Sequence, residues 1–322
     1  MQQGKVPYNV LKRSVIRPVL GSPRGLPGGG LDSSVFSSGK DGVFVMTANP
    51  VTVTGADGVY YGVHRCLADL YAAGAVPVGI EDVVLLPVET EEATLQHLMH
   101  MLRCVCEETG VPILGGHTTV SGAVTRPVIT LSGVGRAEAE PEILHPSRDL
   151  VVTKWIGLAG TALLASEKEQ SLLARYTVDF VEHAKSMKAL VQTGAEIGIA
   201  GNFHAVIHNV SEGGILAALW ELLESAGLGM DIDLKRIPIR QETVELTEYF
   251  GLNPYQMLST GSYLMAVEDG QALVEALAEA GIPASVIGKT TSEKARIIRR
   301  DEEVRYLDRP AMDELYRVGL LY

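Results

Sequence analysis

The sequence predicts a mixed α/β protein built from two lobes. Its 322 residues are 46% hydrophobic and 20% charged, so the chain can bury a sizeable core, and roughly 150 residues per domain suggests two domains. Short β-branched apolar runs alternate with segments of helical periodicity. A polar stretch at 136–149, with Pro141 and Pro146, separates the two halves. We therefore predict one domain over 1–140 and another over 148–322.

Strand and helix signals alternate through the first half. Residues 5–20 carry apolar side chains near helical spacing, and the glycine- and proline-rich stretch 21–30 predicts a loop after that helix. Short apolar runs predict buried strands, and longer periodic segments predict helices. The predicted strands are 43–46, 80–86 and 128–134, and the predicted helices are 60–73 and 90–109.

The second half shows the same mixture and opens with a predicted strand at 150–154. Five segments of helical periodicity follow, with short strands between them. The helices are 160–167, 178–197, 213–226, 240–249 and 270–280, and the strands are 205–208 and 262–267. Both lobes are therefore expected to be α/β.

Composition narrows the class of protein. A formal charge of −12 disfavours nucleic acid as a partner, because backbone recognition needs a concentrated basic surface. The first residues show no signal-peptide pattern, and no apolar run reaches the ~18 residues of a membrane span. Cys66, Cys104 and Cys106 lack metal-ligand spacing and are expected to be reduced. We expect a soluble, cytoplasmic protein that binds neither nucleic acid nor membrane.

A glycine-rich segment at 28–36 is the first candidate site. Gly29 and Gly30 let backbone N–H groups approach phosphate oxygens, and the carboxylate of Asp32 can hold a Mg²⁺ ion that bridges them. The alternative is a flexible loop with a turn aspartate. The segment is neither a P-loop nor a dinucleotide-binding fingerprint.

Asp69 is the second candidate, in the middle of a predicted helix among apolar neighbours. A carboxylate in that setting is costly unless it is paired or bound to a metal, and it lies too far from the helix ends to act as a cap. The alternative is an exposed aspartate on a polar face.

The third candidate follows an apolar run that begins at Pro112. Gly115, Gly116, His117 and Thr118 place small and polar groups at the predicted carboxyl end of a strand, where α/β proteins usually bind ligands. A structural turn with a solvated His117 is the alternative.

The fourth candidate is the turn between a strand and the helix that begins near Gly213. Asn209 or Ser211 can cap that helix, and its N-terminus at Gly213 suits a phosphate group. Lys154 either reaches a phosphate or faces solvent. Capping alone, with no ligand, remains an alternative for the turn.

Taken together and in this order, these clusters resemble the aminoimidazole ribonucleotide (AIR) synthase superfamily over nearly the whole chain. That superfamily includes selenophosphate synthetase, thiamine-monophosphate kinase and the hydrogenase-maturation protein HypE. The motifs G-D-D-A-A-V, T-T-D, N-D-L-A-A-M-G-A, G-G-[DEH]-T and H-D-x-T-x-G-G are matched by 30–36, 47–49, 68–75, 115–118 and 208–214. Residues 4–7 and 154–161 look like a HypE-related subgroup.

The resemblance implies a two-lobe PurM-like fold. Its N-terminal lobe would pair with a second copy in a barrel-type dimer interface, and its C-terminal lobe would cover the nucleotide. Members use ATP to phosphorylate an oxygen or a selenide, and such transfer needs mainly positioning and cation neutralisation of phosphate charge. The resemblance therefore implies ATP and Mg²⁺ as cofactors and a small acceptor substrate.

The resemblance also assigns roles to the candidate residues. Asp32 and Asp69 would hold Mg²⁺, and His117 would be the general base, because its ordinary pKa lies near the operating pH. Lys154 and Gly213 would contact phosphate. Residues lining the nucleotide would be Gly29, Gly30, Asp32, Asn49, Gly115, Gly116, Thr118, Asn209, Ser211 and Gly213.

Two departures from the family pattern bear on activity. Asn49 and Asn209 stand where the family has acids, which should weaken metal binding because asparagine brings an oxygen but no charge. No cysteine follows Cys106, so HypE's modification of a C-terminal cysteine is not expected. The sequence thus favours an ATP-dependent phosphoryl-transfer enzyme; a non-catalytic nucleotide-binding accessory protein and a thiamine-monophosphate-kinase-like enzyme remain alternatives.

Overall fold

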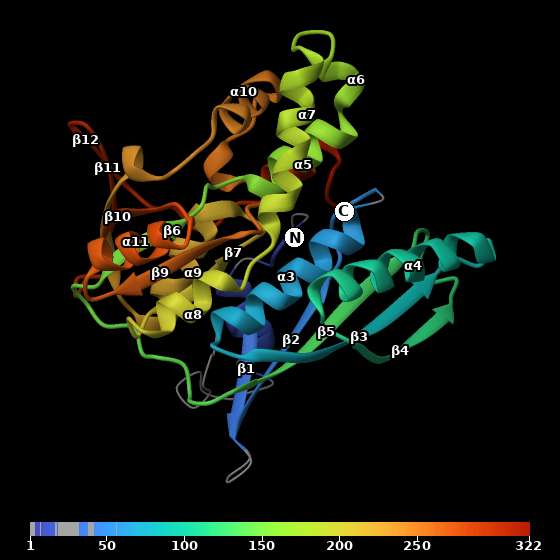
Figure 1. Ribbon diagram of the computed structural model, residues 1–322, viewed down its shortest axis with the longest axis horizontal. Coiled ribbons are helices and arrows are strands. Elements are labelled where there is room, and N and C mark those ends of the chain that lie inside the picture. Colours follow the sequence, from blue (N-terminus) through green and yellow to red (C-terminus); the bar gives the residue numbers. More distant parts are fainter. Residues whose placement is uncertain (1–3, 7, 17, 19–31, 38–41, 56) are drawn as a thin grey trace.

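The computed structural model describes residues 4–6, 8–16, 18, 32–37, 42–55 and 57–322, and it has two β-sheets with helices packed between and around them (Figure 1). The first sheet has the strand order β1-β2-β5-β3-β4. Only β3 and β4 pair in parallel; the other neighbours are antiparallel. Its strands are β1 (Ser33–Ser37), β2 (Val43–Pro50), β3 (Val76–Leu86), β4 (Ile113–Val120) and β5 (Val128–Ala137).

Two long helices, α3 (Gly58–Ala72) and α4 (Glu92–Thr109), cover one face of this sheet. Helix α4 is amphipathic and ends where Gly110 adopts the left-handed conformation, at φ 70°, that favours glycine at a helix end. The short α1 (Tyr8–Leu11) and the π-helical turn η1 (Lys12–Ile16) precede the sheet.

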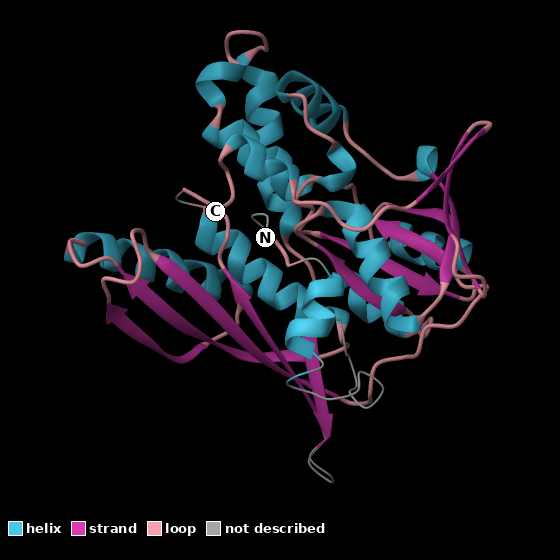
Figure 2. Ribbon diagram, turned by 180° about the vertical axis from the view of Figure 1, so that it is seen from behind, coloured by secondary structure: helices cyan, strands magenta, loops and turns pink. Residues whose placement is uncertain are grey.

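The second sheet belongs to the C-terminal half and has the strand order β12-β11-β8-β10-β6-β9-β7. Strand β9 is fully buried and reads as one apolar run, because helices cover both faces of the sheet there (Figure 2). The strands are β6 (Asp149–Thr153), β7 (Val206–Val210), β8 (Gly229–Asp233), β9 (Ser262–Val267), β10 (Ala284–Thr291), β11 (Arg296–Arg300) and β12 (Glu303–Tyr306).

The helices of the second half form two groups. Helices α9 and α11 pack on the sheet, whereas α5, α7 and α10 pack on one another and project away from it (Figure 1). The α-helices are α5 (Leu158–Glu167), α6 (Glu169–Leu172), α7 (Val178–Ser186), α8 (Ala195–Gly201), α9 (Gly214–Ala226), α10 (Gln241–Phe250) and α11 (Gly270–Glu279). The 3-10 turns are η4 (Met187–Val191), η5 (Leu234–Arg236), η6 (Pro254–Gln256) and η7 (Glu314–Val318).

Helix α3 lies between the two lobes. It packs on β2 and β5 of the first sheet and on β7 of the second, and every residue from Gly58 to Leu70 is buried. The C-terminal segment returns to the first lobe, where Leu321 pairs with Val53 in an isolated bridge. A helix buried on all sides has no solvated face, so each polar side chain on α3 needs a partner within the protein.

Within the part of the chain that the structure describes, no helix covers the other face of the five-stranded sheet. Apolar side chains stand exposed on it at every second position of the strands, including Phe36, Met46 and Val83, which are 46%, 47% and 44% exposed. Antiparallel sheets commonly bury one face and expose the other, but the exposed face is usually polar. This face is therefore a candidate contact surface.

The structure confirms most of the predicted elements and corrects two. The helix predicted over 178–197 is three pieces, because the chain breaks after η4 and turns at Gly194, whose φ is 129°. Residues 115–118 do not follow a strand but lie inside β4. The helix predicted at 5–20 appears as α1 and η1, and the loop predicted at 21–30 lies outside the described residues. Among the described residues, no helix is both long and apolar enough to cross a membrane.

Candidate functional site

Asp69 lies at the junction of the two lobes and accepts hydrogen bonds from both. Nδ2 of Asn49 on β2 donates to its Oδ2 at 2.6 Å, and Nδ2 of Asn209 on β7 donates to its Oδ1 at 2.9 Å. The hydroxyl of Thr47 lies 3.2 Å from the same Oδ2 and 2.9 Å from the main-chain oxygen of Asp32. Asp69 is only 2% exposed, so the buried, partnered aspartate expected from the sequence is confirmed and the exposed alternative is wrong.

A second group of charged side chains surrounds Asp32, just before β1. Nζ of Lys5 lies 3.0 Å from Oε1 of Glu221 and 4.0 Å from Oδ1 of Asp32. Nε2 of His208, the neighbour of Asn209 on β7, lies 3.1 Å from Oε2 of Glu221 on α9. The N-terminal segment, a strand of each sheet and a helix of the second lobe thus meet at one place.

A buried ion pair ties the lobes together beside this group. Nη1 of Arg65 on α3 lies 3.3 Å from Oε2 of Glu212, which precedes α9, and the two side chains are 10% and 5% exposed. Glu212 also accepts a hydrogen bond from the Tyr316 hydroxyl at 3.1 Å. Because Tyr316 belongs to the returning C-terminal segment, two distant parts of the chain, α3 and that segment, converge on Glu212.

The junction carries an excess of negative charge. Among the described residues named above, Lys5 and Arg65 are cations and Asp32, Asp69, Glu212 and Glu221 are carboxylates, so these side chains carry two net negative charges when His208 is neutral. Burial and the charge of Asp32 raise the pKa of Asp69 above its ordinary value. Burial alone would also raise the pKa of Asp32, but Lys5 and other nearby cations lower it. Burial opposes a charge on His208, yet its hydrogen bond to Glu221 raises its pKa.

Lys154 and Gly213, both predicted to contact phosphate, are hydrogen-bonded to other residues of the protein. Nζ of Lys154 lies 2.7 Å from the buried carboxylate of Glu196 and donates to the main-chain oxygen of Gln192 at 2.6 Å. The N–H of Gly213 donates to Oδ2 of Asp313 at 2.7 Å. Lys154 therefore does not face solvent, and a carboxylate of the C-terminal segment holds the start of α9.

The cap predicted for that helix is wrong. Gly213, in the left-handed conformation at φ 87°, is the N-cap, and no side chain caps the helix from that position. The amide of Asn209 is directed to Asp69 instead, and Ser211 uses its main-chain oxygen to accept from the N–H of Gly214 at 3.0 Å. Glycine at 213 permits a turn that a side chain would strain.

The predicted residues of β4 lie apart from the junction. Asn49, Leu131, Asp82 and Gly116 stand in one row across the sheet, so Gly116 is three strands, roughly 14 Å, from Asn49. His117 pairs with the exposed Val83 and is itself exposed on the uncovered face. Gly115, Gly116 and Thr118 are exposed beside it. The structure thus brings Asp32, Asn49, Asp69 and Asn209 together but not the Gly115–Thr118 segment; Gly29 and Gly30 lie outside the described residues.

Sequence reasoning missed five charged residues of the junction: Lys5, Arg65, His208, Glu212 and Glu221. A signal was present for Arg65, which stands four residues before Asp69 and so on the same face of a helix. Lys5 and Glu221 are 216 residues apart and no local pattern joins them.

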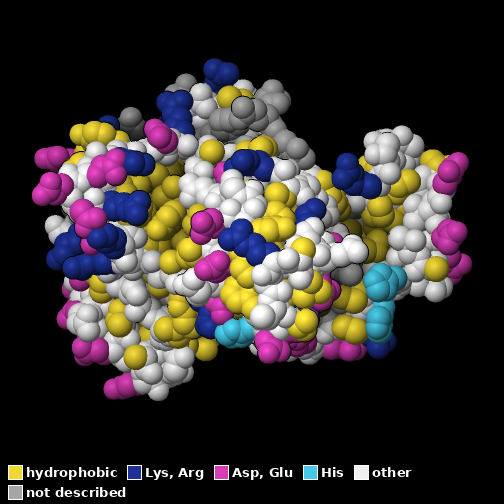
Figure 3. Space-filling view, turned by 90° about the horizontal axis from the view of Figure 1, so that it is seen from above, with side chains coloured by type: hydrophobic (Ala, Val, Ile, Leu, Met, Phe, Trp, Pro, Cys, Tyr) yellow, Lys and Arg dark blue, Asp and Glu magenta, His cyan; other side chains and the backbone are white. Residues whose placement is uncertain are grey.

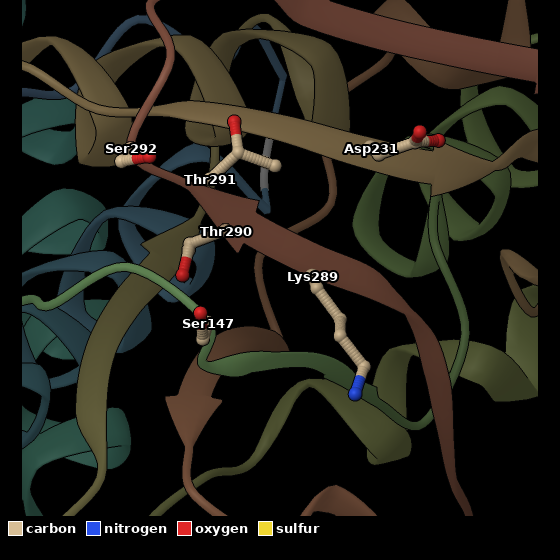
Figure 4. A pocket seen from close by; sticks show the side chains of 6 residues that line it. All are labelled: Ser147, Asp231, Lys289, Thr290, Thr291 and Ser292. Carbon is tan, nitrogen blue, oxygen red and sulfur yellow. The ribbon is translucent and has the colours of Figure 1, made fainter.

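A hollow of about 510 Å³ lies elsewhere, on the second sheet (Figure 4). Figure 4 shows hydroxyl-bearing side chains gathered on one side, with Lys289 and Asp231 directed away from them. Both charged groups are paired, Lys289 with Asp149 and Asp231 with Arg299. The lining residues are Ser147, Asp231, Lys289, Thr290, Thr291 and Ser292.

Two α/β lobes that enclose a charged junction define a two-lobe, PurM-like class of protein. Residues 30–137 match the N-terminal domain of the AIR synthase related proteins, and residues 147–300 match their C-terminal domain. The chain belongs to this family, on its HypE-like branch.

This chain is similar to known proteins over most of its length. The carbamoyl dehydratase HypE of Rhodobacter capsulatus is 27% identical over 260 residues, 78% of this chain and 74% of its own. The crystal structure of a HypE–HypF complex superposes with a TM-score of 0.71 at 19% identity, covering 93% of this chain and 99% of that chain. A HypE structure in complex with ATP gives 0.68 at 17% identity and covers 97% of both.

Proposed function

We propose that this chain binds ATP with Mg²⁺ at the junction of its two lobes and uses it to phosphorylate or activate a small acceptor. The observation that carries the proposal is the convergence of Asp32, Asn49, Asp69 and Asn209, which come from four family motifs far apart in the sequence. A HypE that resembles this chain over its whole length has been solved in complex with ATP. Binding at this place would put the nucleotide between lobes that are already tied together.

The residues at the junction fit a magnesium ion. Oδ2 of Asp32 and Oδ1 of Asn209 are buried acceptor oxygens without a hydrogen-bond partner among the described residues, and oxygen atoms are the ligands that Mg²⁺ prefers. Asp69 would join them once the amides of Asn49 and Asn209 turn their oxygens inward. The ion would neutralise phosphate charge during in-line transfer.

The chain's own residues would position the nucleotide. Lys5 and Arg65 supply positive charge beside the carboxylates, and Arg65 is held in place by Glu212. His117 stays our proposed general base, and its position on the uncovered sheet face means that it could reach only a site formed with a second copy. The same reasoning makes the homodimer part of the proposal, because the apolar face around Val83 would be covered by that copy.

The test is calorimetric titration of the full chain with ATP and with ADP, with and without Mg²⁺, together with phosphate release from the same samples. We expect ATP binding that needs Mg²⁺, slow hydrolysis, and at least a tenfold loss of affinity in Asp32→Asn, which removes a proposed ligand charge. Asp301→Asn is the matched control, since Asp301 is exposed and pairs with Lys235, another exposed residue. Absence of nucleotide binding under every condition would overturn the proposal.

A second candidate function, a non-catalytic accessory protein, is favoured by one observation. Asn49 and Asn209 stand where the family has acids, and their amides donate hydrogen bonds to the carboxylate of Asp69. These hydrogen bonds stabilise the junction without a bound cation. A HypE of similar fold has been solved as a complex with HypF, so a surface of this fold can bind another protein. Nucleotide binding with no turnover for any acceptor, together with specific capture of a protein partner, would favour this candidate.

A further inference from the structure

Three possible metal ligands from three different elements meet beside the junction. A carboxylate oxygen of Asp32, a ring nitrogen of His208 and a carboxylate oxygen of Glu221 all lie within 4.8 Å of one another. Asp32 precedes β1 and is far from the other two in sequence, whereas His208 on β7 and Glu221 on the following helix α9 are 13 residues apart. This group shares Asp32 with the proposed Mg²⁺ site, but it uses His208 and Glu221 in place of Asp69 and Asn209.

Local contacts leave the group short of positive charge. The ammonium of Lys5 lies against Glu221 at 3.0 Å but 4.0 Å from Asp32, and its one charge faces two carboxylates. Oδ2 of Asp32 is buried and has no hydrogen-bond partner among the described residues. A buried carboxylate oxygen without a partner is costly, and a cation removes that cost.

The spacing and the ligand types suit a divalent ion. Metal–ligand bonds of about 2.0–2.2 Å place ligand atoms roughly 3.0 to 4.2 Å apart, so a pair separated by 4.8 Å would need to close by at least about 0.6 Å. An imidazole with two carboxylates favours a transition-metal ion such as Mn²⁺, Co²⁺ or Zn²⁺ over Mg²⁺, which prefers oxygen ligands only. A divalent ion would balance both carboxylates, which Lys5 does not.

We propose that Asp32, His208 and Glu221 bind a divalent transition-metal ion. In the absence of the metal, the ammonium group of Lys5 pairs with the carboxylates and competes with the ion for them. Binding would displace Lys5 from Glu221, and the side chain of Lys5 is 31% exposed, so it has an open path to solvent. His208 would release its hydrogen bond to Glu221 and bind the ion through the same Nε2. The inference goes beyond the proposed function because it needs no nucleotide.

The test is titration of the EDTA-treated full chain with Co²⁺ and with Mn²⁺, in the absence of nucleotide, by calorimetry and by the visible absorption of bound Co²⁺. We expect one equivalent to bind with an absorption band that reports a nitrogen ligand. His208→Gln and Glu221→Gln should each weaken binding at least tenfold, and Lys5→Met should tighten it about tenfold by removing the competing cation. Circular dichroism and thermal melts of each variant establish that it is folded.

Matched controls use the same substitutions at an exposed histidine and an exposed lysine. His183→Gln changes a histidine that pairs with Glu242, and Lys235→Met changes a lysine that pairs with Asp301, so neither should alter Co²⁺ affinity. Equal Co²⁺ binding by the wild type and His208→Gln would overturn the site. Unchanged or weaker binding by Lys5→Met would overturn the role of Lys5. Loss of ATP binding with retained Co²⁺ binding would refute the proposed function alone.

Discussion

Nδ2 of Asn49 lies 2.6 Å from Oδ2 of Asp69, and Nδ2 of Asn209 lies 2.9 Å from Oδ1 of the same carboxylate. The two amides therefore take the place of a cation, because their N–H groups present partial positive charge to the buried carboxylate of Asp69 from both lobes. Family members with acids at these positions would need a cation there, because carboxylates this close repel one another. In this chain, hydrogen bonds from the two asparagines stabilise the buried carboxylate of Asp69 without a cation.

Restoring an acid should make the fold depend on Mg²⁺. In Asn49→Asp a new carboxylate would lie against Asp69 in a buried site, and we expect a loss of about 3 kcal/mol in the free energy of unfolding in EDTA. Added Mg²⁺ should recover part of that loss by bridging the two acids. Urea unfolding with EDTA and with Mg²⁺ measures both effects.

The control for this change is Asn253→Asp. The side chain of Asn253 accepts from the N–H of Tyr255 at the start of η6, and its Nδ2 donates to Oε1 of Gln256 at 3.2 Å. Aspartate keeps the first bond and can accept from the Gln256 amide once that amide turns, so stability should change by less than about 0.5 kcal/mol. Full stability of Asn49→Asp in EDTA would contradict our account of the amides. Gain of Mg²⁺ affinity without turnover would favour the accessory function over the enzyme.

Much of the fold could be predicted from periodicity. Strands β2, β3, β5, β7 and β9 and most of the helices occur where the sequence predicts them, because each buries one continuous apolar run or stripe. Strand β12, at the edge of the second sheet, was missed because all its side chains are exposed and two of the four, Glu303 and Arg305, are charged. An edge strand of that kind is held by its main-chain ladder and has no apolar pattern.

The candidate site, like the fold, could be predicted from the sequence only in part. Asp69 could be recognised because a charge among apolar helix residues demands a partner, and that demand is local in the sequence. Lys5 and Glu221 could not, since each is ordinary in its own segment and only the fold brings them together. The sequence predicts that His117 lines the nucleotide site because it follows two glycines. Gly116 pairs with the buried Asp82, however, and successive residues of a strand point to opposite faces, so His117 points to the other face of the sheet.

Asp313 should make stability fall as pH rises. Its carboxyl is buried beside Glu212 and Glu314, and burial first and then these charges raise its pKa from 3.8 to about 7. A group whose pKa is raised on folding holds its proton more tightly in the folded state, so the stability it contributes is complete below 3.8 and is lost as pH rises through about 7. The slope over this window is at most about 1.4 kcal/mol per pH unit.

Asp313→Asn removes this titration. The variant should lose about 1 kcal/mol at low pH, because one of the two N–H groups of Gly213 and Leu315 loses its acceptor, and its stability should then vary less between pH 4 and 7. Chemical unfolding at several pH values gives the difference from wild type. Parallel pH profiles for the two proteins would show that Asp313 does not titrate in this range.

The uncovered face of the five-stranded sheet gives a direct test of the dimer. Val83 is 44% exposed on that face, and a glutamate there would place a charge where a second copy is proposed to pack. We expect Val83→Glu to convert a dimer into a monomer in light scattering after size exclusion, with its melting temperature measured alongside. Val178→Glu is the control, because Val178 is 62% exposed at the first turn of α7, where an acidic side chain is favourable. A wild-type monomer, or a Val83→Glu protein that stays dimeric, would mean that this face does not join two copies, and His117 would then have no site within reach.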